Sequence, residues 1–337
     1  MKKPAGLLTA IMMVAILCIG CSSNKDADTG INNKDTATVD ADTAGQGADV
    51  TQAAGEQENE SEKLNVMVSF YPMYDFVSKV GGEKVSVTGM VPAGNEPHDW
   101  EPAASDIAAL EEADMFIYNG AGMEHWVDTV LDSLGNKELV TVEASAGIEL
   151  LGGHSEEGEE DSEEAYDPHV WLNPVNAKKV MLNIKDALVK ADPGNAEYFT
   201  KNYETYAAEF DELDQKYKDA LTGLEKKDII VAHEAFGYLC KAYGLNQVGI
   251  EGLSPDSEPD PARMEEIIEF AKENNVKIIF FEELVSPKVA ETIANEVGVE
   301  TDVLNPLEGL SDEELNAGAD YFSVMEENLQ RLLNALR

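Results

Sequence analysis

The sequence predicts an α/β protein with two lobes, each built on a parallel-type sheet, that are joined by one long backbone helix. Two observations predict the sheets: short β-rich runs alternate with helical patterns, and this alternation occurs twice along the chain. The third observation is a segment between the two series that carries a single apolar stripe at helical spacing. Of the 337 residues, 43% are hydrophobic, which is enough to form a substantial core.

The first 63 residues are expected to precede the folded body. Residues 1–20 have the pattern of a signal peptide, because two lysines precede a short uncharged run. The following Gly20-Cys21-Ser22-Ser23 resembles the lipobox of bacterial lipoproteins, so we expect lipidation of Cys21, with ordinary cleavage and secretion as the alternative. Residues 21–63 contain few large apolar side chains and should form a disordered acidic tether.

The N-terminal lobe is expected over residues 64–194. Its strand candidates are residues 64–70, 85–91, 115–118 and 139–142, and Ser105 is the expected N-cap of a helix. Residues 152–166 form an acidic low-complexity segment with one histidine, His154, and we expect a loop there. That loop either gathers cations near a binding site or is a solvated insertion.

A linking helix is expected over residues 195–223. Its apolar residues recur at steps of three and four, and they are Phe199, Tyr203, Tyr206, Phe210, Leu213, Tyr217 and Ala220. Asp192-Pro193-Gly194 interrupts the chain before this helix, and Gly223 lies just beyond its last turn. A helix of this length, about 40 Å, would bridge both lobes. The alternative is a helical hairpin with the preceding helix at 177–189.

The C-terminal lobe is expected over residues 224–337, with strands at 228–232, 247–250, 276–281 and 301–304. The proline-rich stretch 254–261 should be a stiff loop, and Pro261 should lie in the first turn of a helix.

The charge of the chain excludes one class of partner and favours another. It has 24 basic and 66 acidic residues, a formal net charge of -42, so nucleic acid would be repelled and cations are the natural small partners. Three cysteines and five histidines allow neither a disulfide framework nor a cysteine-based metal cluster. Any transition-metal site must therefore depend on histidine.

Three histidines lie in turn-rich segments beside predicted elements: His98, His169 and His233. Taken singly, each is more often a surface or hydrogen-bonded structural residue. Ligands near the carboxyl ends of parallel strands converge on the crevice where α/β folds bind their ligands, so together the three indicate a shared metal site. His125 is expected at the surface beside a packed Trp126, and Cys240 is expected to be a buried core thiol.

These histidine segments are followed by further motifs: Phe236-Gly237-Tyr238, Tyr243-Gly244-Leu245, Ser254-Pro255 and Leu304-Asn305-Pro306-Leu307-Glu308. In this order they resemble the zinc/manganese-specific solute-binding lipoproteins of ABC transporters, over residues 65–337. The resemblance implies two lobes with a metal in the cleft between them. It also implies a monomeric extracytoplasmic receptor, anchored to the cell membrane, that delivers its ion to a permease and ATPase.

On this resemblance, His98, His169 and His233 would be three metal ligands and Glu308 the fourth. Glu96, Asp99 and Glu282 are the other candidates for the carboxylate. Manganese-type members usually carry a carboxylate in place of the third histidine. Three imidazoles and one carboxylate suit tetrahedral Zn²⁺ better than Mn²⁺, which prefers more oxygen ligands.

The sequence therefore favours a high-affinity zinc receptor, with a manganese receptor of the same family or a surface adhesin as alternatives. A zinc hydrolase is a remote alternative, because three protein ligands with an open fourth position would be a catalytic arrangement. A fourth ligand at Glu308 would close that position, and the sequence contains neither H-E-x-x-H nor G-x-S-x-G. We therefore expect no enzyme and no catalytic residues.

Overall fold

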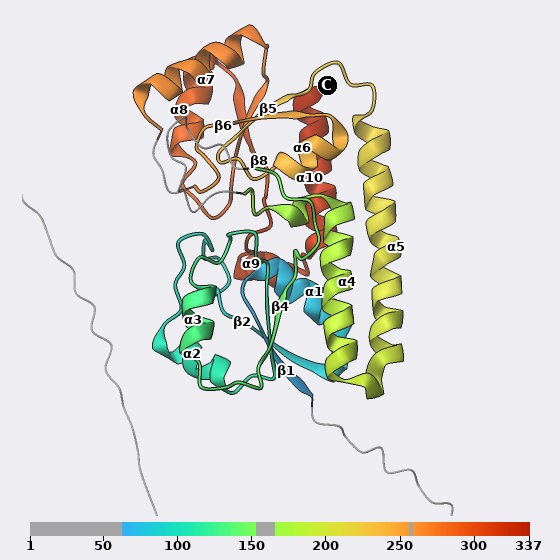
Figure 1. Ribbon diagram of the computed structural model, residues 1–337. Helices are drawn as coiled ribbons and strands as arrows, with labels where there is room; N and C mark the ends of the chain where they lie inside the picture. Colours follow the sequence, from blue (N-terminus) through green and yellow to red (C-terminus); the bar gives the residue numbers. More distant parts are fainter. Residues whose placement is uncertain (1–62, 153–165, 256–258) are drawn as a thin grey trace, which may run out of the picture. The chain divides into compact units, whose positions relative to one another are not determined.

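The computed structural model describes residues 63–152, 166–255 and 259–337, which contain two four-stranded parallel sheets (Figure 1). The strand order is β2-β1-β3-β4 in the first sheet and β6-β5-β7-β8 in the second, so the two halves share one topology. The strands of the first sheet are β1 (Leu64–Val68), β2 (Val85–Gly89), β3 (Met115–Tyr118) and β4 (Val140–Glu143). Those of the second are β5 (Asp228–Val231), β6 (Asn246–Gly249), β7 (Ile278–Phe281) and β8 (Glu300–Val303). The predicted fold class is confirmed.

The helices connect the strands and cover the sheets. In the first half they are α1 (Tyr71–Gly81), α2 (Ala104–Glu111), α3 (Val127–Ser133) and α4 (Pro174–Ala191), followed by the long α5 (Ala196–Leu221). In the second half they are α6 (Gly237–Tyr243), α7 (Pro261–Glu273), α8 (Lys288–Val297), α9 (Asp312–Ala317) and α10 (Tyr321–Leu336). Short 3-10 turns lie at Gly82–Lys84, Val170–Leu172 and Pro193–Asn195.

Several sequence expectations lie outside the described residues: the signal peptide, Cys21, the tether, and all but the ends of the acidic loop. The bases of that loop meet at a bridge between Gly152 and Tyr166. Among the helices that the structure does describe, none has the length and apolar composition needed to span a membrane.

The predicted N-cap of α2 is wrong by two residues. The helix begins at Ala104, and Ser105 lies inside its first turn. The N-cap is Ala103, whose backbone N–H donates to the Asp106 carboxylate at 2.8 Å. An acidic side chain in the first turn therefore accepts a hydrogen bond from the backbone N–H of the N-cap residue, and the serine hydroxyl is not needed as a cap.

The long helix α5 both forms a hairpin with the preceding helix and contacts helices of both halves. It runs beside α4 as a helical hairpin, held in part by Lys178 and Asp211 at 2.7 Å (Figure 1). The side-chain amide of Asn202 in α5 also donates to Val80 O of α1, and the hydroxyl of Tyr217 donates to Met325 O of α10. Because α5 bonds to helices from both ends of the chain, it supports both halves.

The last helix, α10, contacts the first half of the protein at its start. Tyr321, at the start of α10, packs edge-on against Phe76 of α1 with ring centroids 5.0 Å apart. Asp320 pairs with Lys79 of α1 at 3.0 Å. The segment that begins α10 therefore packs on the first half, and one hydrophobic core includes buried residues of both halves.

Candidate metal centre

The structure brings together the four side chains His98, His169, His233 and Glu308. His98 lies between β2 and α2, and His169 lies between β4 and α4. His233 directly follows β5, and Glu308 follows β8. Each residue presents one ligand atom, and the four atoms all lie within 4.8 Å of one another. Loops at the carboxyl ends of both sheets thus converge on one point, as parallel α/β folds allow.

The distances within this cluster fit a small four-coordinate ion. Nε2 of His169 lies 3.2 Å from Nε2 of His98 and 3.2 Å from Nε2 of His233. The Glu308 Oε1 atom lies 2.9 Å from His169 Nε2 and 3.2 Å from Nε2 of each of the other two histidines. Ligands about 2.0–2.1 Å from a tetrahedral Zn²⁺ are about 3.3 Å apart. Five of the six distances between ligand atoms are close to this value, and the sixth, between His98 and His233, is at most 4.8 Å.

Burial is uneven across the cluster. The side chains of His169 and His233 are 0% exposed and that of Glu308 is 1% exposed, whereas that of His98 is 10% exposed. Polar groups in such a position are costly to bury unless each finds a partner or a metal. His98 is therefore the member of the cluster that solvent reaches.

Two buried carboxylates orient the buried histidines. Asp167 Oδ1 lies 2.8 Å from Nδ1 of His169 and also accepts the His169 backbone N–H at 2.9 Å. Glu282 Oε1 lies 2.5 Å from Nδ1 of His233. Because a carboxylate accepts a hydrogen bond from the Nδ1–H group, each pairing favours the tautomer whose Nε2 lone pair is directed into the cluster.

These neighbours also shift the proton affinities. Burial lowers the pKa of His169, but the bonds to Asp167 and Glu308 outweigh it, so the pKa is raised. Burial likewise lowers the pKa of His233, while the charges of Glu282 and Glu308 raise it well above its ordinary value. Burial raises the pKa of Glu308, but His233 and His98 hold it well below its ordinary value. Protons and metal ions therefore compete for Nε2.

The loop that carries Glu308 is tied directly to the loop that carries His169. The indole N–H of Trp171 donates to Pro306 O at 2.8 Å, and Trp171 is fully buried. Leu307 has a left-handed backbone with φ of 60°, an unfavourable conformation for a residue with a side chain. Asn305 accepts the Leu307 N–H at 2.7 Å, which holds this turn in place.

The remaining candidates have other positions. Glu282 orients His233, and both Glu96 carboxylate oxygens accept the His98 N–H at 3.0 Å. His125 is 38% exposed, as expected of a surface residue, and Cys240 is buried and unpaired, as expected of a core thiol. The roles of Asp167 and Trp171 were not predicted from the sequence, although each lies only two residues from His169.

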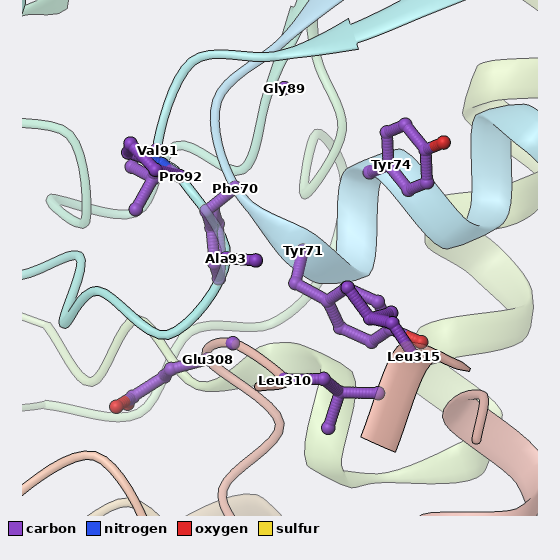
Figure 2. A pocket seen from close by; sticks show the side chains of 11 residues that line it. Phe70, Tyr71, Tyr74, Gly89, Val91, Pro92, Ala93, Glu308, Leu310 and Leu315 are labelled. Carbon is purple, nitrogen blue, oxygen red and sulfur yellow. The ribbon is translucent and has the colours of Figure 1, made fainter. Parts of the chain in front are cut away.

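An apolar pocket of about 200 Å³ adjoins the cluster on the side of Glu308. Its lining includes Phe70, Tyr71, Tyr74, Leu310 and Leu315. Figure 2 shows the Glu308 carboxylate directed away from these side chains. The carboxylate is therefore presented to the histidines, and the pocket offers a metal ion few other polar groups.

Known proteins of the same type match nearly the whole described body. Residues 66–335 match the family model described as zinc-uptake complex component A, periplasmic. The high-affinity zinc uptake system protein ZnuA of Bacillus subtilis is 46% identical over 288 residues, which cover 84% of this chain and 90% of ZnuA.

A second relative is the zinc-binding lipoprotein AdcA of Streptococcus pneumoniae, 43% identical over 83% of this chain but only 57% of AdcA. The crystal structure of its Zn(II)-bound ZnuA-like domain superposes with a TM-score of 0.71 at 42% identity, covering 82% of this chain and 99% of that domain.

A third is the laminin-binding protein Lmb of Streptococcus agalactiae, described as bifunctional with adhesin and metal transporting activity. Its structure superposes with a TM-score of 0.73 at 33% sequence identity, and the match covers 82% of this chain and 100% of Lmb. The family match over most of the chain, together with these relatives, shows that the chain belongs to the family of zinc-uptake complex component A.

Proposed function

We propose that this protein is an extracytoplasmic receptor that binds one Zn²⁺ ion with high affinity and delivers it to an ABC permease driven by its ATPase. The observation that carries the proposal is the cluster of three histidine Nε2 atoms and one Glu308 oxygen within 4.8 Å. Membership of a zinc-uptake family and the similarity to a Zn(II)-bound domain support the same ion.

The ligand set favours Zn²⁺ over Mn²⁺. Three imidazole nitrogens and one carboxylate oxygen form a nitrogen-rich set of four, whereas Mn²⁺ is better served by more oxygens and a higher coordination number. His233 is central to this choice because its buried Nδ1 partner, Glu282, fixes the ring with Nε2 facing the cluster. Mn²⁺ should therefore bind more weakly.

A transport role also fits the four-ligand arrangement better than catalysis does. A catalytic zinc site keeps one position for water, whereas the four protein atoms here would complete a tetrahedron. The ion would be held without an activated water. We therefore propose that the site captures and releases its cargo and promotes no reaction.

We further propose that the protein acts as a monomer attached to the cell membrane through a lipid on Cys21. The Gly20-Cys21-Ser22-Ser23 sequence supports the anchor, and the related AdcA is called a lipoprotein. Adhesion is a second candidate function because Lmb is described as both adhesin and metal transporter. Adhesion would appear as binding to a matrix protein that persists when the cluster histidines are replaced.

The test is a Zn²⁺ titration against a chromophoric chelator, for the wild type and for His98→Gln, His169→Gln, His233→Gln and Glu308→Gln. The expected result is one tight Zn²⁺ per chain, weaker Mn²⁺ binding, and large losses in all four variants. His125→Gln is the matched control, because His125 does not belong to the cluster. Weak, multiple and salt-sensitive binding by the wild type would contradict the proposal.

A further inference from the structure

A polar pocket of about 220 Å³ adjoins the metal cluster on the side of His98. Both halves of the protein line it, with His98, Asp99, Met123, His125 and Pro168 from the first half and Ser254 from the second. His98 is also the member of the cluster with the largest exposed fraction, 10% against 1% or less for the other three. This pocket therefore leads from solvent to the accessible ligand.

The two pockets that touch the cluster differ in what they offer a cation. The pocket beside Glu308 is lined mainly by aromatic and aliphatic side chains. An ion passing through it would lose water and meet few polar groups before it reached Glu308, which is costly. The pocket beside His98 offers an imidazole and a carboxylate, His125 and Asp99, in addition to His98. The approach through this polar pocket is the favourable one for a hydrated divalent ion.

His125 is placed to contact an ion on this approach. Its side chain is 38% exposed, it lines the pocket, and its Nε2 lies 3.8 Å from Oε1 of Glu101, which is 78% exposed. Imidazole and carboxylate together suit Zn²⁺. Within the described residues, only the four-residue cluster brings three or more potential ligands close enough to share an ion. His125 and Glu101 would thus supply two ligands, and water would fill the other positions.

We propose that Zn²⁺ enters through this pocket and that His125, assisted by Glu101, binds the ion transiently before it passes to His98. This inference rests on the proposed zinc-receptor function. The step exchanges water molecules for protein ligands, and only coordination bonds form and break. A transient ligand replaces water as it leaves the ion and so lowers the free-energy barrier between solvent and cluster, which accelerates entry and exit by the same factor. It leaves the equilibrium affinity unchanged.

The test is stopped-flow measurement of Zn²⁺ association and of Zn²⁺ dissociation into excess chelator, on the purified full chain. His125→Gln should lower both rate constants by about threefold to tenfold with an unchanged dissociation constant. Glu101→Gln should change both in the same direction by less. Leu315→Ser is the matched control, because Leu315 lies at the apolar pocket and is 37% exposed, and its rates should equal those of the wild type.

Two results would overturn the inference. Unchanged rate constants in His125→Gln would show that the ion does not use this residue. A weaker equilibrium affinity with an unchanged association rate would make His125 a ligand of the resting site or a structural support. Both differ from failure of the proposed function, in which the wild-type chain itself would bind no stoichiometric Zn²⁺.

Discussion

Replacing Glu282 with glutamine should weaken Zn²⁺ binding without removing a metal ligand. Glu282 is 4% exposed, and its Oε1 lies 2.5 Å from Nδ1 of the fully buried His233. Glutamine has nearly the same shape and can still accept the Nδ1–H through its amide oxygen. The change therefore removes the negative charge behind His233 and little else.

The magnitude follows from the strength of this one hydrogen bond. A bond to a charged group contributes about 1.5–3 kcal/mol and a neutral bond about 0.5–1.5 kcal/mol, so the charge accounts for about 1–1.5 kcal/mol. At about 1.4 kcal/mol for each factor of ten, the affinity should fall about tenfold. Losses of about 10- to 100-fold are typical when the partner of a ligating histidine is replaced.

The pH dependence gives this prediction a second signature. The charge of Glu282 also raises the pKa of His233, so the wild type must displace a more tightly held proton at low pH. Glu282→Gln weakens that competition. The loss of affinity should therefore be largest near pH 8 and smaller near pH 6.

Chelator competition at the two pH values measures both effects. Glu327→Gln is the control, since it makes the same charge change at a side chain that is 68% exposed and pairs with Arg331. An affinity of Glu282→Gln equal to that of the wild type at both pH values would show that the charge of Glu282 contributes nothing to Zn²⁺ binding. It would mean that the carboxylate does not hold His233 in its binding orientation.

Three further predictions concern the same site. Zn²⁺ affinity should fall as pH decreases, because protons compete with the ion for the histidines. The pKa values of His169 and His233 are raised, so the fall should begin above their ordinary value near 6.5. Competition titrations from pH 8 to 5.5 would measure this, and a flat profile would contradict it. Gly237→Ala should weaken binding, measured by the same titration, because its Cβ would lie 2.4 Å from Oδ2 of Asp167 and displace the carboxylate that orients His169. Trp171→Phe should lower the free energy of unfolding, measured by urea denaturation, by about 1–3 kcal/mol, because Pro306 O loses its buried hydrogen-bond donor. A variant as stable as the wild type would show that this hydrogen bond does not stabilise the fold.

The strands were predictable because local composition and burial agree. Met115–Tyr118 is a run of large apolar residues, and it forms the buried strand β3 with the expected bounds. Strand ends were less accurate: the predicted strand at 64–70 leaves the ladder after Val68, because Phe70 becomes the N-cap of α1. Its backbone is still extended there, with φ of -146°, so composition alone does not mark the change.

The four cluster residues were predictable for a different reason. Histidine is scarce in this chain, and the motifs around His98, His169, His233 and Glu308 resemble those of a known family. Their supporting contacts were not predictable, because they depend on tertiary distances. Glu282 pairs with a histidine 49 positions away, and Trp171 bonds to a carbonyl 135 positions away. The packing of Tyr321 against α1 could not be predicted from the local sequence for the same reason.

Zinc-edge X-ray absorption on the protein loaded with one equivalent of Zn²⁺ would identify the atoms that bind the ion. We expect four nitrogen and oxygen neighbours at about 2.0–2.1 Å, with the outer scattering of about three imidazole rings. Loss of one imidazole contribution in His233→Gln would identify that ligand. A six-coordinate, oxygen-rich shell in the wild type, or fewer than two imidazoles, would contradict a site built from His98, His169, His233 and Glu308.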